Sequence, residues 1–138
     1  MRSSHQMRYD NAMTTVMLIH RFLTSLGFTV IVETAILFLL LRFIFKKQQL
    51  QTPQIIAAGL FASFATLPYV WFVFPYVWHW PGSAVYWSES FAFIVEAIFY
   101  RLFLKLDWKV AFIVSLICNA GSFLLGPLLR SHGLWIYW

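Results

Sequence analysis

Long apolar runs separated by short polar breaks dominate the chain, and two of them carry a glutamate near the centre. Four runs are long enough to cross a bilayer, which takes about 20 mostly apolar residues. They cover approximately residues 22–45, 55–78, 85–104 and 110–129. The pattern therefore predicts an all-α integral membrane protein with four transmembrane helices.

The segments outside these runs are short. We expect residues 1–21 to form a polar N-terminal tail with an interfacial turn, and residues 130–138 to form an aromatic C-terminal tail. Met13 is a second candidate for the native start. Because the apolar run continues past residue 22 without a small-residue cleavage site, we expect no signal-peptide cleavage.

The second run contains small residues and prolines. Gly59, Ser63 and Thr66 share one face of the expected helix, and small residues on a face allow membrane helices to approach closely. Pro68 and Pro75 remove backbone hydrogen bonds, so we expect a kink near the end of this helix.

A six-residue pattern occurs twice. Phe28-Thr-Val-Ile-Val-Glu33 returns as Phe91-Ala-Phe-Ile-Val-Glu96, with Phe, Ile, Val and Glu in the same register. The helix after each copy also matches at identical spacing: Leu60, Ser63 and Thr66 correspond to Leu116, Asn119 and Ser122. Residues 22–78 and 85–129 are therefore expected to be tandem helical hairpins in parallel orientation, related by an axis along the membrane normal. Common ancestry stays a hypothesis, since chance also yields such matches in apolar helices.

Composition agrees with a surface that faces lipid. The chain is 61% hydrophobic and 11% charged, whereas a soluble domain is about 45–50% apolar and about 25% charged. The net charge of +5 does not indicate nucleic-acid binding, because the basic residues lie mainly at the ends of the apolar runs. The expected surroundings are instead the lipid bilayer, with a second copy or partner membrane subunits.

Basic residues also predict the orientation. They gather at the ends of the first and third runs and just after them, at Arg42, Lys46, Lys47, Arg101, Lys105 and Lys109, whereas Arg2, Arg8 and Arg21 favour the opposite orientation. Short loops rich in Lys and Arg stay on the cytoplasmic side. We therefore expect both termini outside, in a prokaryotic inner membrane.

Glu33 and Glu96 are the leading candidates for a functional site. A charge at the centre of a span is costly in lipid, so both should face protein or a cavity. The polar helix faces, turned inward, give a candidate ion- or substrate-binding set: Glu33, Ser63, Thr66, Glu89, Glu96, Tyr100, Asn119 and Ser122. The repeat predicts contacts between Glu33 and Ser63 and between Glu96 and Asn119. A lone buried carboxyl favours its neutral form, and two close ones share protons.

Motifs for other chemistry are absent from the sequence. It has no Gly-rich phosphate loop and no His-Glu-x-x-His pattern. The single Cys118 excludes an intrachain disulfide and a Cys-pair zinc motif. Glu89 with His79 and His132 is an alternative outer site for a metal or headgroup, but its spacing matches no known metal motif. We expect no cofactor and no metal.

Three functions are compatible with these features. The first is an ion- or proton-binding, transporter-like protein that uses the paired glutamates. The second is an accessory or assembly subunit, in which the polar groups only fasten helices at about 0.6 kcal/mol per contact. The third is an intramembrane enzyme in which Glu33 and Glu96 do acid–base work on a lipid-linked substrate. The first is favoured because packing alone would be better served by Leu, Ala or Gly at both positions.

Overall fold

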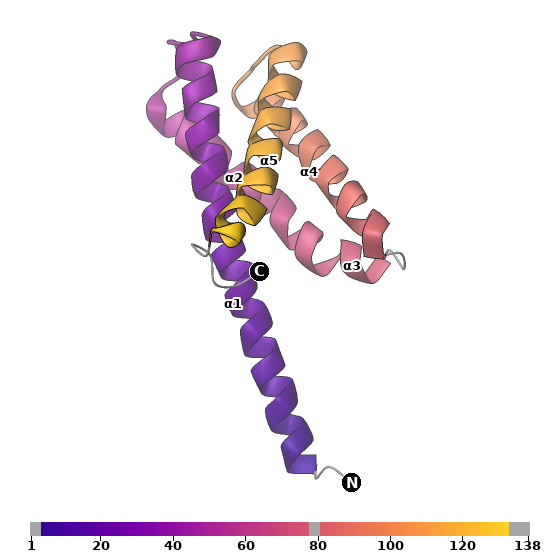
Figure 1. Ribbon diagram of the computed structural model, residues 1–138. Coiled ribbons are helices and arrows are strands. Elements are labelled where there is room, and N and C mark those ends of the chain that lie inside the picture. Colours follow the sequence, from indigo (N-terminus) through magenta and orange to yellow (C-terminus); the bar gives the residue numbers. More distant parts are fainter. Residues whose placement is uncertain (1–3, 78–80, 133–138) are drawn as a thin grey trace.

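The computed structural model of the chain describes residues 4–77 and 81–132, which are helical apart from short connections. Helix α1 spans Ser4–Leu39 and continues directly into a π-helical turn, Leu40–Ile44. The remaining helices are α2 (Thr52–Phe72), the short α3 (Phe74–Val77), α4 (Pro81–Phe103) and α5 (Trp108–Ser131) (Figure 1). No strand occurs in these residues, so the all-helical prediction is confirmed.

The four long helices form a closed ring of contacts. Helix α1 packs against α2 and α5, and α4 packs against the same two helices. Helices α1 and α4 therefore occupy opposite corners of the bundle, with α2 and α5 at the other two. The two glutamates lie on opposite corners, since Glu33 belongs to α1 and Glu96 to α4.

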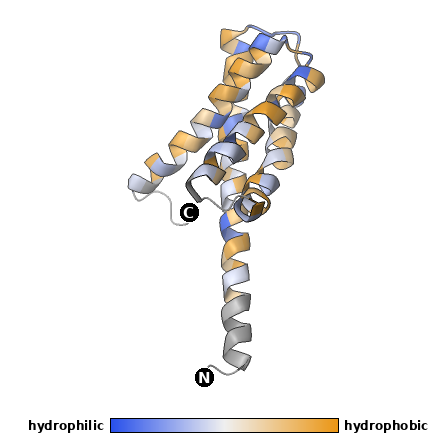
Figure 2. Cartoon of the chain, turned by 90° about the vertical axis from the view of Figure 1, so that its right-hand side faces the viewer, coloured by the Kyte–Doolittle hydropathy of each residue, from blue (hydrophilic) through white to orange (hydrophobic). Residues whose placement is uncertain are grey.

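Three described segments are long and apolar enough to cross a membrane: Met13–Ile44, Thr52–Val77 and Trp108–Leu129. Large hydrophobic side chains cover their outer faces, including Ile31, Phe61 and Leu124. Figure 2 shows apolar residues along the length of the bundle and hydrophilic ones at its loop end. This surface fits an integral membrane protein.

An apolar core fills the end of the bundle where α1 joins α2 and α4 joins α5. Both connections lie at this end, where Lys47 Nζ is 3.5 Å from Asp107 Oδ2. The core residues come from all four long helices, the π-helical turn and the connection between α4 and α5: Leu37, Leu40, Leu41, Ile55, Ala58, Ala62, Tyr100, Leu104, Leu106, Ala111, Val114 and Cys118. This packing fixes the four helices relative to one another just beyond Glu33 and Glu96.

Gly59 allows α1 and α2 to approach closely, as its place on a small-residue face predicts. A Cβ atom at this position would lie 3.0 Å from the Thr34 Cα atom of α1 and would overlap the Thr34 hydroxyl. Because a backbone atom cannot move aside as a side chain can, glycine is needed here.

The N-terminal segment differs from the expectation. Helix α1 already begins at Ser4, so residues 4–21 extend the first helix instead of forming a tail and an interfacial turn. No glycine or proline occurs between Ser4 and Leu26 to interrupt the helix. From residue 133 onward the expected C-terminal tail lies outside the described part of the chain, as do residues 1–3 and 78–80.

The helix formed by the second apolar run is interrupted near its end, next to a proline. Pro68 is accommodated inside α2, but the helix stops at Phe72 and resumes at Phe74, next to Pro75. Pro75 has no N–H to bond to the carbonyl one turn earlier. The interruption occurs where the prolines predict a kink, and α3 lies beside the start of α4 (Figure 1).

Candidate functional site

Glu33 is held by one hydroxyl from each neighbouring helix. Its side chain is 1% exposed. Ser63 on α2 donates a hydrogen bond to Glu33 Oε2 at 2.8 Å. Ser122 on α5 donates to Glu33 Oε1 at 2.7 Å. Both carboxyl oxygens of this buried acid therefore have a partner, as burial in a low-dielectric environment requires.

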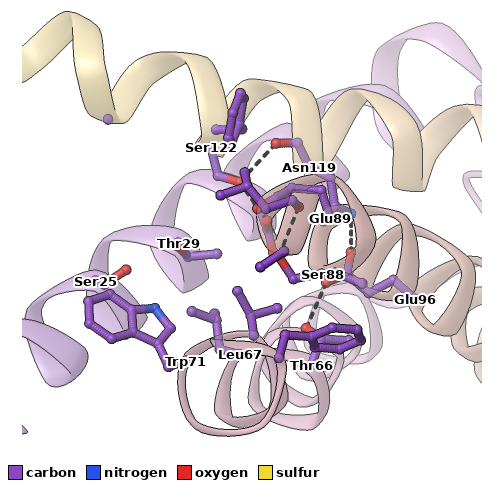
Figure 3. A pocket seen from close by; sticks show the side chains of 18 of the residues that line it. Ser25, Thr29, Thr66, Leu67, Trp71, Ser88, Glu89, Glu96, Asn119 and Ser122 are labelled. Atoms are coloured by element: carbon purple, nitrogen blue, oxygen red, sulfur yellow. Dashed lines mark hydrogen bonds between the residues drawn. The ribbon is translucent and has the colours of Figure 1, made fainter. Parts of the chain in front are cut away.

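Glu96 has the same type of surroundings, and it is also 1% exposed. Thr66 on α2 donates to Glu96 Oε1 at 3.1 Å. The Asn119 amide on α5 donates to Glu96 Oε2 at 2.6 Å. Figure 3 shows Thr66 and Asn119 directed toward Glu96 from opposite sides. Each acid thus accepts one hydrogen bond from α2 and one from α5.

The four donors occupy matched positions of the two half-sequences. The expected pairs within a hairpin, Glu33 with Ser63 and Glu96 with Asn119, are both present. The other two bonds cross between hairpins: Ser122 reaches back to Glu33, and Thr66 reaches forward to Glu96. Thr66 and Ser122 are also a matched pair. The cross-hairpin contacts were not predicted from the repeat alone.

The hydroxyl groups at this site have a second acceptor within reach. Ser63 Oγ lies 3.0 Å from the Gly59 carbonyl oxygen, and Ser122 Oγ lies 3.1 Å from that of Asn119. A hydroxyl has one hydrogen to give and can also accept. When Glu33 is ionised, the serine donates to the carboxylate. When Glu33 is protonated, the carboxyl donates to the serine, which turns to the backbone carbonyl. In either form the Glu33 carboxyl group and both serine hydroxyls keep a partner.

At Glu96, only one carboxyl oxygen has a hydroxyl partner that can switch between donating and accepting a hydrogen bond. Thr66 Oγ1 lies 3.2 Å from the Ala62 carbonyl oxygen and can turn to it in the same way. Asn119 Nδ2 instead bonds both Glu96 Oε2 and the Ser115 carbonyl oxygen, the latter at 3.0 Å. An amide nitrogen only donates. A proton on Glu96 therefore fits the oxygen that faces Thr66.

A cavity of about 350 Å³ ends at these two acids. Four helices and α3 contribute to it, and its inner end is formed by Glu33, Thr66, Glu96, Asn119 and Ser122. Helix α1 adds Thr29 and Ser25, about one and two turns before Glu33 on the same face. The outer part is lined by Phe74, Pro75, Ala84 and Pro127. The cavity thus extends from the acids toward the α3 end, away from the basic loops.

Tyr100 is not part of this network, contrary to the grouping expected from the sequence. It is 0% exposed and belongs to the apolar core, and its hydroxyl has no hydrogen-bond partner among the described residues. Tyr100 follows Glu96 by one helical turn in the direction of the loops. That turn places it beyond the closed end of the cavity.

Glu89 lies nearer the outer end, where it lines the cavity. It also lines a groove of about 260 Å³ between α4 and α5. Of its proposed partners in an outer metal site, His79 is outside the described residues, and the His132 ring lies 2.9 Å from the Leu128 carbonyl oxygen of its own helix. The described residues contain no group of three or more His, Cys, Asp or Glu suited to a metal.

Several cavity residues were not among the candidates. Ser25 and Thr29 precede Glu33 at intervals of four, and this spacing was the available signal. Trp71, Phe74 and Phe123 also line the cavity. Aromatic residues at such positions look like ordinary lipid-facing residues in a sequence, so no pattern distinguishes them.

No family model, curated protein or solved structure matches the chain.

Proposed function

We propose that the protein is a transporter-like membrane protein that binds protons or cations at Glu33 and Glu96. One observation carries the proposal: both buried acids form the closed end of a cavity that is large enough for a small molecule. Acids that served only to fasten helices would have no need of such a cavity. The hydroxyl partners tolerate gain or loss of a proton, which a site that exchanges protons requires.

We assign α4 as a fourth transmembrane helix. Its 23 residues correspond to about 34 Å at about 1.5 Å per residue, and the hydrocarbon core is about 30 Å thick. Helix α4 packs between α2 and α5, which are both apolar enough to span a membrane. Its lower hydropathy has a cause, since Glu96 faces the bundle interior and Glu89 the cavity.

Two parallel hairpins are the arrangement that we assign to the four spans. The support is the matched set of hydrogen bonds around Glu33 and Glu96, in which equivalent donors serve equivalent acids. The two basic loops meet at one end through Lys47 and Asp107. Placing that end in the cytoplasm of a prokaryotic cell puts the cavity mouth on the outside.

Passage across the membrane needs more than this single conformation. The apolar core closes the cavity beyond the acids, so a bound ion reaches the other side only after the helices rearrange. Homo-oligomers or partner membrane subunits would provide the surface against which one hairpin moves relative to the other. The accessory-subunit function differs in predicting acids that never exchange a proton.

Carbodiimide labelling in lipid nanodiscs tests the proposal. Dicyclohexylcarbodiimide is apolar and reacts with protonated carboxyl groups, so it reports acids that are both protonated and reachable. We expect labelling of Glu33 or Glu96 that falls as the pH rises, located by mass spectrometry. The Glu33→Gln and Glu96→Gln variants identify the labelled residue, and Asp107→Asn is the control. Absence of labelling at every pH in folded protein would favour acids that serve only packing.

A further inference from the structure

The charge of the cavity selects the sign of its ligand. Among its lining residues Glu33, Glu89 and Glu96 are acidic, and none is basic. The basic loops lie at the opposite end, beyond the apolar core, and Arg21, one turn before Ser25 on α1, is exposed and is not among the lining residues. A low-dielectric site whose charged lining residues are all acidic attracts a cation and repels an anion.

The walls select the kind of cation. Trp71, Phe74 and Phe123 line the cavity with aromatic rings, together with aliphatic side chains such as Val70 and Leu67. Phe22 supports the Trp71 ring from α1, with ring centroids 6.0 Å apart. Aromatic faces attract cations most strongly where water is excluded. Apolar walls of this kind suit an organic cation better than a hydrated inorganic one.

The acids are also poorly arranged for a compact metal ion. Each of the four carboxyl oxygens of Glu33 and Glu96 already accepts a hydrogen bond from the protein. Metal ions such as Ca²⁺ require six or more oxygen ligands around one point. A cation with diffuse charge needs no such shell, because attraction to a nearby negative charge is sufficient.

Ser25 provides an independent sign that something occupies the cavity. Its side chain is 2% exposed and lines the cavity, yet its hydroxyl has no hydrogen-bond partner among the described residues. Buried hydroxyls almost always have a partner. A ligand or a water molecule in the cavity would supply it.

A route from the lipid joins the cavity at Glu89. The groove between α4 and α5 shares four residues with the cavity: Val85, Glu89, Asn119 and Phe123. Its outer rim carries Tyr86 and Leu116, which are exposed on the surface that we assign to the bilayer. A ligand that partitions into lipid could therefore reach the acids from the side.

We propose that the cavity binds a hydrophobic organic cation that enters from the bilayer between α4 and α5. Binding exchanges charge: the cation enters, and one proton leaves the Glu33–Glu96 pair for water, so the charge of the site is unchanged. This inference rests on the proposed function, because it names the ligand class of the same site. The cavity volume of about 350 Å³ is at the lower end of the range of about 300–1,000 Å³ for small-molecule pockets.

Tetraphenylphosphonium is the probe for the test, since it is apolar and carries a permanent charge. We expect saturable binding to protein in nanodiscs, with one proton released per cation in weakly buffered solution. Glu33→Gln and Glu96→Gln should weaken binding by on the order of tenfold or more, as for loss of one partner of a buried charge pair. Asp107→Asn, at an exposed loop position, should bind as the wild type does. The neutral triphenylphosphine oxide should not compete.

The outcomes separate the two proposals. If the acids are labelled by carbodiimide but tetraphenylphosphonium binds equally well to the double Glu→Gln variant, the ligand class is wrong and the proton site stands. If the acids are neither labelled nor needed for binding, both proposals fail. Binding without proton release overturns the exchange.

The association rate of tetraphenylphosphonium tests whether the ligand enters between α4 and α5. Ala120 lines the groove on α5. Ala65 is an exposed residue of α2 that lines neither the cavity nor the groove. Ala120→Trp should slow the association of tetraphenylphosphonium, and Ala65→Trp should not. Equal association rates in the two variants and the wild type would contradict entry between α4 and α5.

Discussion

Ser122 on α5 donates a hydrogen bond to Glu33 on α1 at 2.7 Å and so joins the two hairpins at the level of the acids. The matched contact from Thr66 to Glu96 crosses between the hairpins in the other direction. Each glutamate is consequently shared by its own hairpin and the other one. Any rearrangement that moves one hairpin relative to the other must break one or both of these contacts.

Removing either cross-hairpin hydroxyl should weaken the bundle by a similar amount. We expect Ser122→Ala and Thr66→Ala each to lower the free energy of unfolding by about 0.5–1.5 kcal/mol, the usual range for a hydrogen bond between membrane helices or in a protein interior. Denaturant titration in mixed micelles measures the change. Ser131→Ala is the control, because the Ser131 hydroxyl contacts only Leu128 and His132 at the exposed end of α5. A loss confined to one of the two contacts would argue against equivalent roles.

Gly59 and Gly27 should respond in opposite directions to alanine. A methyl group at Gly59 meets the backbone of Thr34, whereas nothing lies within 4 Å of one at Gly27. Gly59→Ala should therefore destabilise the protein by roughly 1–3 kcal/mol through overpacking. Gly27→Ala should stabilise α1 by about 0.5–1 kcal/mol, because alanine is the better helix residue. The same unfolding titration measures both variants, and equal effects would contradict the close approach of α1 and α2.

One lysine follows the first helix of each hairpin, and its backbone adopts the left-handed conformation. Lys46 has φ 50° and Lys105 has φ 53°, where glycine is usual at the end of a helix. Lys105→Gly should stabilise the protein by about 1 kcal/mol, the approximate cost of this conformation for other residues. Ala65→Gly, at an exposed position in the interior of α2, should instead cost about 1 kcal/mol. Thermal unfolding of the two variants compares the signs directly.

Tyr100→Phe tests whether this tyrosine belongs to the site. Its hydroxyl is buried without a described partner, so its removal should leave stability unchanged or raise it by about 1 kcal/mol. Carbodiimide labelling of Glu33 and Glu96 should also be unchanged, because Tyr100 lies beyond the end of the cavity. A loss of labelling in folded protein would return Tyr100 to the site.

Much of the site follows from patterns within one helix or one repeat. Glu33 and Glu96 had to face inward because a charge in lipid is costly. Ser63 and Asn119 were expected partners because the repeat places them alike. The cross-hairpin bonds depend on which helices lie at adjacent corners of the bundle, and no local pattern encodes that order.

Other features depend on tertiary packing in the same way. The π-helical turn at Leu40–Ile44 continues the apolar run of α1, and apart from Arg42 its residues are of the same kind as those before it. Tyr100 shares a helix face with Glu96, but the cavity stops at Glu96, because side chains from α1, α2 and α5 fill the next turn. The sequence gives no sign of where a cavity ends.

The most direct test of the account is an infrared titration of the carboxyl groups in lipid, comparing wild type with Glu33→Gln and Glu96→Gln. We predict protonated-carboxyl bands that are lost in the variants and that change with pH and with added tetraphenylphosphonium in the wild type. Bands that stay the same under every condition would show that the two acids only fasten the helices, and the proposed proton and cation site would be wrong.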